Sequence, residues 1–85
     1  MNRDEQPVEW VSFLDELDDA REHLAELVQS LQDADSFDEA ELRVNLGHVY
    51  AHLNRAWHSR AHSGEITAAL WPKFSRFPND LEPVG

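Results

Sequence analysis

The sequence predicts a small all-α domain in which two long helices form an antiparallel hairpin. Apolar residues recur at alternating spacings of three and four over residues 7–32 and again over residues 36–63, which is the period of an α-helix. The short connection between the two stretches forces the helices to run antiparallel. We therefore expect one domain over residues 1–85, frayed over residues 1–6, and a helical bundle formed by two copies of it.

The first helix is expected to have an apolar side and an acidic side. Pro7 suits its first turn, where the missing backbone N–H is not needed. The main apolar stripe should face the second helix. It consists of Trp10, Leu14, Leu17, Leu24, Val28 and Leu31. Phe13, Ala20 and Leu27 widen one flank of this stripe, whereas His23 falls among the acids and is expected to be exposed.

The second helix is predicted by its start, its body and its end. Ser36 and Glu39 form a capping box, in which each side chain bonds to the backbone N–H of the other residue. Gly64 follows the last turn as a left-handed cap residue. The body carries an apolar stripe that should face the first helix. That stripe consists of Leu42, Leu46, Val49, Tyr50, Leu53, Ala56 and Trp57.

The same helix carries a second, thinner apolar set on roughly its opposite side. This set consists of Phe37, Ala40, Val44, Gly47 and Ala51. A helix that is apolar on two sides is normally covered on both, and the small residues Gly47 and Ala51 would let another backbone approach closely. The covering element is either the C-terminal segment or a second copy of the chain.

The C-terminal segment is predicted to form a short helix over residues 67–76 and an extended, docked tail over residues 78–85. Its aromatic residues are expected to fold back across the hairpin of the same chain or of a partner. Together with the second apolar set they define the predicted interface of a homodimer. That interface consists of Phe37, Val44, Gly47, Ala51, Trp71 and Phe74.

The composition narrows the classes of function. The 85 residues carry a formal net charge of −10, which argues against nonspecific binding to nucleic acid or to an anionic membrane, because both need a basic surface. Residues 1–41 hold 14 acidic and 2 basic side chains, whereas residues 42–85 hold 3 acidic and 5 basic ones. There is no cysteine, and no apolar run reaches the roughly 18 residues of a membrane span. We therefore expect a cytoplasmic protein without a signal peptide or transmembrane helix.

Two histidine pairs on the second helix are candidate metal ligands. His48 and His52 are four residues apart, as are His58 and His62, so the members of each pair lie on adjacent turns of one helix face. Either pair could hold a divalent metal ion through imidazole nitrogens. Neither pair belongs to a metallopeptidase motif, and zinc prefers three or four protein ligands. The competing interpretation is that these histidines are solvated or bonded to carboxylates, and no cofactor is predicted from the pairs alone.

A second candidate site is a cluster of hydrogen-bond donors near the end of the same helix. Arg55, His58 and Arg60 could bind a phosphate or carboxylate, because guanidinium groups match these anions. The charge asymmetry favours the simpler interpretation that the arginines pair with acids of the first helix or of a partner. For catalysis, we find no cysteine nucleophile, no Gly-rich phosphate loop and no serine in a nucleophile-elbow pattern. We therefore do not expect an enzyme.

The leading functional prediction is a non-catalytic protein–protein interaction or assembly module that associates with itself. The first alternative is a metal-binding helical protein that uses one or both histidine pairs. The second is a binder of small anions or nucleotides that uses Arg55, His58 and Arg60. Histidines placed at an interface would also make assembly depend on pH near neutrality.

Overall fold

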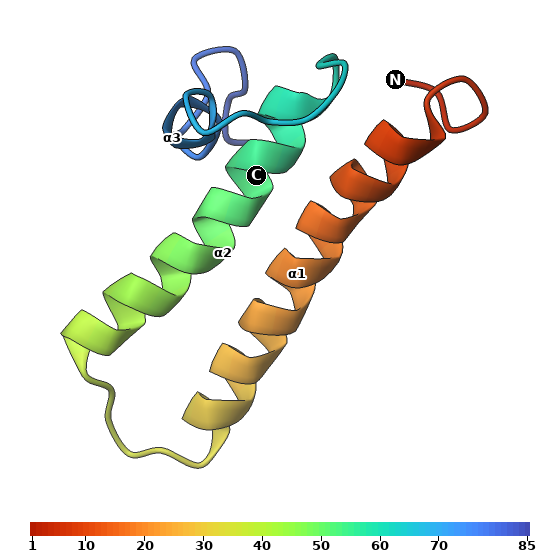
Figure 1. The fold of residues 1–85 in the computed structure, drawn as a ribbon. Helices are drawn as coiled ribbons and strands as arrows, with labels where there is room; N and C mark the ends of the chain where they lie inside the picture. Colours follow the sequence, from red (N-terminus) through yellow and green to blue (C-terminus); the bar gives the residue numbers. More distant parts are fainter.

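Two long antiparallel helices and one short helix make up the fold (Figure 1). The computed structural model describes all of residues 1–85 and assigns α1 to Pro7–Gln32, α2 to Glu39–Ser59 and α3 to Trp71–Phe74. The chain is 60% helical and has no strands, and the two long helices pack against each other. The predicted all-α hairpin is therefore confirmed, and α1 has the predicted bounds.

The predicted start of the second helix is wrong by three residues. The N-cap of α2 is Asp38, whose carboxylate accepts a hydrogen bond of 2.8 Å from the backbone N–H of Ala40. This carboxylate supplies the capping oxygen two residues closer to the helix than the Ser36 hydroxyl, so the chain stays non-helical over residues 36–38. The capping box of Ser36 and Glu39 is therefore not formed.

The predicted end of the second helix, at residue 63, is also too late. The backbone N–H of Arg60 bonds to Trp57 O and that of His62 to Ser59 O, so tighter turns replace the α-helical pattern. The Arg60 guanidinium also donates to Trp57 O at 2.7 Å, which satisfies a carbonyl that the helix end would leave free. Gly64 does adopt a left-handed conformation, with φ of 83°, but it lies beyond the helix rather than capping it.

The short third helix is one turn long instead of covering residues 67–76. Pro72 has no backbone N–H to donate, so a regular helix does not continue through it from Thr67. The Thr67 hydroxyl instead accepts from the backbone N–H of Leu70 at 3.3 Å within a turn. After Phe74 the Ser75 hydroxyl donates to Trp71 O at 2.8 Å and closes the end of α3.

Small and medium-sized apolar side chains form the centre of the seam between α1 and α2. The buried apolar residues of the two long helices are Ala20, Leu27, Val49 and Ala56. The first helix therefore meets the second through the flank of its apolar stripe, where Ala20 and Leu27 lie. The expectation that the main stripe of the first helix faces the second is wrong, because Leu14, Leu24 and Val28 stay 44 to 52% exposed.

The main stripe of α2 is displaced from the seam in the same way. Val49 and Ala56 are buried, but Leu46, Tyr50 and Leu53 are 45 to 48% exposed. Along each helix the exposed leucines lie about 60° round the axis from the buried residues, at 100° per residue. The histidines of the seam lie on the other side of the same buried residues.

Both displaced stripes lie on one side of the hairpin. His23 of α1 touches the rings of His48 and His52 of α2, so the histidine flanks of the two helices meet on one side of the seam. The leucine flanks must then meet on the opposite side. We call this apolar surface the hairpin face. It consists of Leu17, Leu24, Val28 and Leu31 of α1 and Leu46 and Leu53 of α2.

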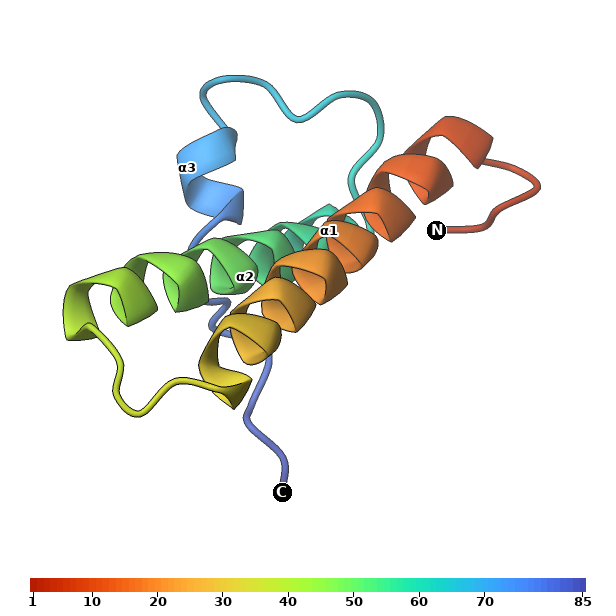
Figure 2. The ribbon, with the colours of Figure 1, turned by 90° about the horizontal axis from the view of Figure 1, so that it is seen from below.

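The C-terminal segment wraps the outer surface of α2 and leaves the hairpin face uncovered. Figure 2 shows α3 on one side of the two long helices and the C-terminal tail leaving on the other. The tail is held at the edge of α2, where Phe77 stacks on Tyr50 with ring centroids 5.9 Å apart and Asp80 accepts from the indole N–H of Trp57 at 2.9 Å. No helix combines the length and the apolar character that crossing a membrane would require.

Candidate functional site

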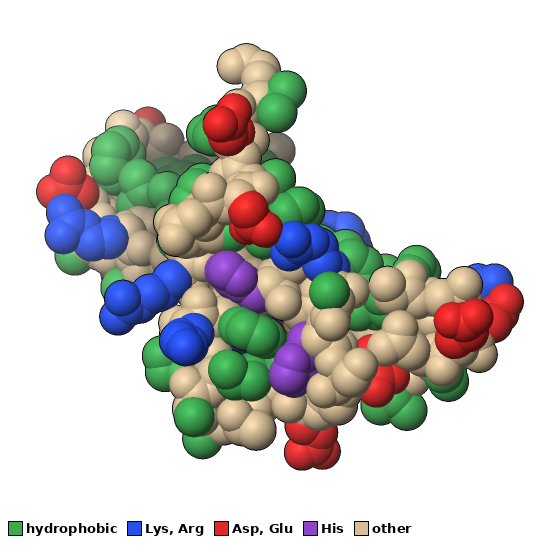
Figure 3. Space-filling view, turned by 90° about the horizontal axis from the view of Figure 1, so that it is seen from above, with side chains coloured by type: hydrophobic (Ala, Val, Ile, Leu, Met, Phe, Trp, Pro, Cys, Tyr) green, Lys and Arg blue, Asp and Glu red, His purple; other side chains and the backbone are tan.

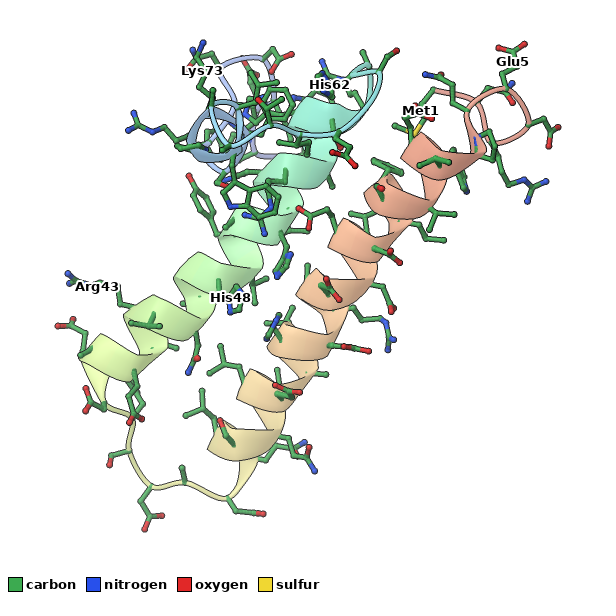
Figure 4. All side chains as sticks on the ribbon, viewed as in Figure 1. Met1, Glu5, Arg43, His48, His62 and Lys73 are labelled. Atoms are coloured by element: carbon green, nitrogen blue, oxygen red, sulfur yellow. The ribbon has the colours of Figure 1, made fainter.

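Three histidines from two helices lie together on the polar side of the seam. The ring centroids of His23 and His48 are 4.0 Å apart, those of His48 and His52 are 4.9 Å apart, and those of His23 and His52 are 5.3 Å apart. One ring nitrogen of each residue lies within 4.8 Å of the others. Figure 4 shows His48 projecting from α2 toward α1. The predicted pair of His48 and His52 thus gains a third imidazole from the other helix.

His23 is the member of this histidine cluster that the sequence analysis missed, because amphipathic patterning placed it on the acidic side. The expectation that it is exposed is wrong, since it is half-buried in the seam. The sequence does contain a pattern that indicates the position of His23. Both helices have the same spacing of apolar residues around one histidine. The pattern of α1 is Leu17, Ala20, His23, Leu24 and Leu27, and that of α2 is Leu46, Val49, His52, Leu53 and Ala56. Each histidine flanks the buried line of its own helix, so an antiparallel pair brings the two together.

Glu16 connects this cluster to a buried arginine. One carboxylate oxygen of Glu16 lies 3.2 Å from Nδ1 of His52, and the other accepts from Nε of Arg55. A guanidinium nitrogen of Arg55 also lies 3.1 Å from the same Nδ1. Because Nδ1 cannot donate and accept at once, we assign its proton to the bond with the carboxylate. In that tautomer the other ring nitrogen of His52, Nε2, carries no proton and offers its lone pair as a hydrogen-bond acceptor.

That Nε2 atom of His52 is buried and has no hydrogen-bond partner. His52 as a whole is 8% exposed, so water does not reach the atom from outside. With the ring proton on Nδ1, Nε2 is an acceptor nitrogen that faces the interior of the seam without a donor.

The same surroundings keep the His48 ring neutral. Partial desolvation is the largest cause that lowers the pKa of His48, and the nearby His23, His52 and Arg55 lower it further. Asp19 acts in the opposite direction but does not outweigh them. Neutral imidazoles are the form that ligates metal ions.

Both arginines of the predicted anion site already have partners within the chain. Arg55 is 5% exposed, pairs with Glu16, donates to the Ser75 hydroxyl at 2.8 Å and lies 4.1 Å from the Trp71 ring centroid. Arg60 lies over the Trp57 ring and pairs with Asp80 at 2.8 Å. The hydrogen bond from Trp57, followed by that from Arg60, lowers the pKa of Asp80. The arginines therefore neutralise carboxylates of their own chain.

The second histidine pair, His58 and His62, contacts the C-terminal segment. The Phe74 ring stacks on His58 with centroids 5.5 Å apart and meets His62 edge-on at 5.4 Å. Nε2 of His58 donates to Arg76 O and Nε2 of His62 to Glu65 O, both at 3.0 Å. Figure 3 shows histidine side chains among hydrophobic and basic ones at this end of the molecule.

The six residues of the predicted dimer interface fall into two groups. Trp71 and Phe74 pack on α2 of their own chain, so they cover the C-terminal half of its second apolar side in cis. Phe37, Val44 and Gly47 remain exposed, and nothing lies within 4 Å of the position that a Cβ of Gly47 would occupy. Ala51 lies between the two groups and is half-buried.

An acidic pocket lies between the start of α1 and the end of α2. Its volume is about 380 Å³, and its lining includes Glu9, Asp15, Glu65 and His62. Glu9 accepts a hydrogen bond of 3.3 Å from the backbone N–H of Gly64, which links the segment after α2 to the first turn of α1. The pocket therefore lies where the open end of the hairpin is held together.

No protein-family model, curated protein or solved structure matches the chain in comparisons with known proteins. Two surfaces distinguish the molecule: the uncovered hairpin face on one side of the seam and the histidine cluster on the other.

Proposed function

We propose that this protein is a non-catalytic assembly module whose hairpin face pairs with that of a second copy to form a four-helix bundle. The observation that carries the proposal is the hairpin face itself. Its six side chains are 37 to 50% exposed, and no other part of the chain packs over them to bury them. A contiguous apolar surface of this kind on a small protein is typical of an interaction site.

The small hydrophobic core of the single chain supports the proposal that a partner covers the hairpin face. Only 8 of the 85 residues are buried, and just four of these are the apolar residues of the seam. A domain of this length already buries a smaller share of its surface than a larger one, and it has no disulfide to compensate. Burial of the hairpin face would add the large leucine side chains that the single chain leaves in water.

The composition of the hairpin face favours a second copy over an unlike partner. None of its side chains is charged, although the chain holds 17 acidic residues. The face therefore has no charge that an oppositely charged partner would match, but it fits another apolar surface of the same shape. Two hairpins related by a twofold axis form a bundle of four helices, which is a common architecture for such helices.

The hydrogen bonds of three serine hydroxyls are in keeping with a role without catalysis. Ser30, Ser59 and Ser75 donate to the carbonyl oxygens of Leu27, Ala56 and Trp71, so their hydroxyls are not placed against a base. We also propose a cytoplasmic location, which fits the composition of the chain.

The experiment is a pair of matched substitutions followed by light scattering after size exclusion. Leu24→Glu places a charge in the hairpin face, whereas Val44→Glu places the same charge on an exposed position of α2 outside it. We expect the wild type and Val44→Glu to be dimers and Leu24→Glu to be a monomer, because an unpaired charge is costly to bury. Dissociation by Val44→Glu with retention of the dimer in Leu24→Glu would instead assign the interface to the second side of α2. A monomeric wild type would overturn self-association altogether.

A further inference from the structure

The histidine cluster has the ligand set of a transition-metal site. Imidazole nitrogens suit zinc, copper, nickel and iron, and three of them come from two helices that the fold already holds together. In a tetrahedral site with metal–nitrogen bonds of about 2.0 to 2.1 Å, neighbouring ligand nitrogens lie about 3.4 Å apart. The nitrogens of His23, His48 and His52 lie within 4.8 Å of one another, so small side-chain rotations would bring them to that distance.

The buried nitrogen of His52 is an independent observation that points to a ligand. Nε2 is shielded from water and has no partner, which is costly for a polar atom in a protein interior. Nδ1 of the same ring lies 3.2 Å from a Glu16 oxygen. Metal-binding histidines characteristically donate their other ring N–H to a carboxylate, which orients the ring and makes the ligating nitrogen more basic. His52 and Glu16 already have this relation.

Two carboxylates supply the charge that a divalent cation needs. Asp19 and Glu16 each have an oxygen within 4.8 Å of a ring nitrogen of His52 and of each other. Asp19 also raises the pKa of His48, so it acts on both histidines of α2. Arg55 is the positively charged side chain near the cluster, and its pairing with Glu16 offsets its charge.

We propose that His23, His48 and His52 bind one divalent transition-metal ion of the zinc type, with Glu16 as the group that orients His52 and Asp19, which has an oxygen within 4.8 Å of a ring nitrogen of His52, as the carboxylate proposed for the fourth position. Such an ion would join the middle of α1 to the middle of α2. Every ligand comes from one chain, and the cluster lies on the side of the seam opposite the hairpin face. The site is therefore independent of self-association, and one ion per chain is expected in either oligomeric state.

The test is a zinc titration of the tag-free, full-length protein in competition with a chromophoric chelator. We expect one zinc ion per wild-type chain and a loss of affinity of about tenfold or more in His23→Ala, because loss of even an outer-shell partner costs roughly ten- to a hundredfold. His58→Ala is the matched control, because it removes a histidine of the same helix that bonds to the carbonyl of Arg76. Its zinc affinity should equal that of the wild type.

Two results would overturn the site. Unchanged affinity in His23→Ala with loss in His48→Ala would mean that zinc is held by the pair on α2 alone. Equal loss in His58→Ala and His23→Ala would mean scattered surface binding. Circular dichroism of the metal-free variants shows whether each remains helical, and His23 is half-buried, so its removal should leave the hairpin intact. Cobalt(II) gives a second readout: an intense visible absorption of tetrahedral geometry is expected in the wild type and should be absent from His23→Ala.

Discussion

The two sides of the seam between α1 and α2 are built from opposite chemistry. On one side Glu16 bonds to both His52 and Arg55 inside a single chain, whereas on the other the leucines of the hairpin face remain in contact with water. A monomer normally buries its apolar side chains first and leaves its charged groups outside. This reversal is the basis of the proposal that a second copy of the chain covers the hairpin face.

The largest loss of stability is expected when Arg55 is removed from the polar side of the seam. Arg55→Ala leaves the Glu16 carboxylate, whose side chain is 15% exposed, without its counter-charge. We expect a loss of about 3 to 5 kcal/mol in the free energy of unfolding, which is typical when one partner of a buried pair is removed. Urea denaturation measures this loss.

Arg43→Ala is the control, because Arg43 lies exposed on the same helix. Its effect should stay within about 0.5 kcal/mol. An equally small effect of Arg55→Ala would show that the pair with Glu16 does not hold the seam.

Lowering the pH tests the polar side of the seam without a substitution. Because the pKa of His48 is lowered below its ordinary value of 6.5 in the folded chain, the unfolded chain binds a proton at this residue first as the pH falls. The free energy of unfolding should therefore be highest above pH 6.5 and decrease as the pH falls from 6.5 to the folded-state pKa. Denaturation of the metal-free protein at a series of pH values measures this decrease.

His48→Gln should reduce that pH dependence, because it removes the titrating ring. An unchanged pH profile in this variant would contradict the role given to His48. The oligomeric mass should not change over the same range, since the histidine cluster lies opposite the hairpin face.

The smallest expected effect is that of Gly47→Ala, which tests whether a second copy packs on the hairpin face or on the second apolar side of α2. Gly47 lies in the middle of α2, and nothing occupies the space that a Cβ would take. Gly47→Ala should therefore stabilise the protein by about 0.5 to 1 kcal/mol, through the higher helix propensity of alanine. Thermal unfolding measures the gain. A loss of stability that grows with protein concentration would mean that a partner approaches Gly47 closely, as the interface predicted from the sequence requires.

The sequence was sufficient for the helices and their antiparallel pairing but not for their relative rotation. Spacings of three and four identify apolar stripes on both helices, and the short connection determines the topology. The pattern cannot say whether a stripe is buried by its own chain or by another, since both satisfy it equally. Leu24 of the main stripe and Ala20 of its flank belong to one broad apolar side in the sequence, yet of these two only Ala20 is buried in the seam.

The errors at individual residues have local causes. Ser36 and Asp38 both carry oxygens able to cap a helix, and the structure uses the one nearer to the first helical residue. His23 was missed because its partners lie more than twenty residues away, on a helix whose rotation the sequence does not determine. The pairing of Arg55 with an acid of the first helix, by contrast, followed from the uneven charge of the two halves of the chain.

Sedimentation equilibrium of the wild-type protein over a wide concentration range is the most direct test of the central claim. The chain has a mass of 9.8 kDa, so the account predicts a particle of twice that mass that dissociates on dilution. A mass of 9.8 kDa at every concentration would contradict it, because the hairpin face would then be stable in water without a second copy.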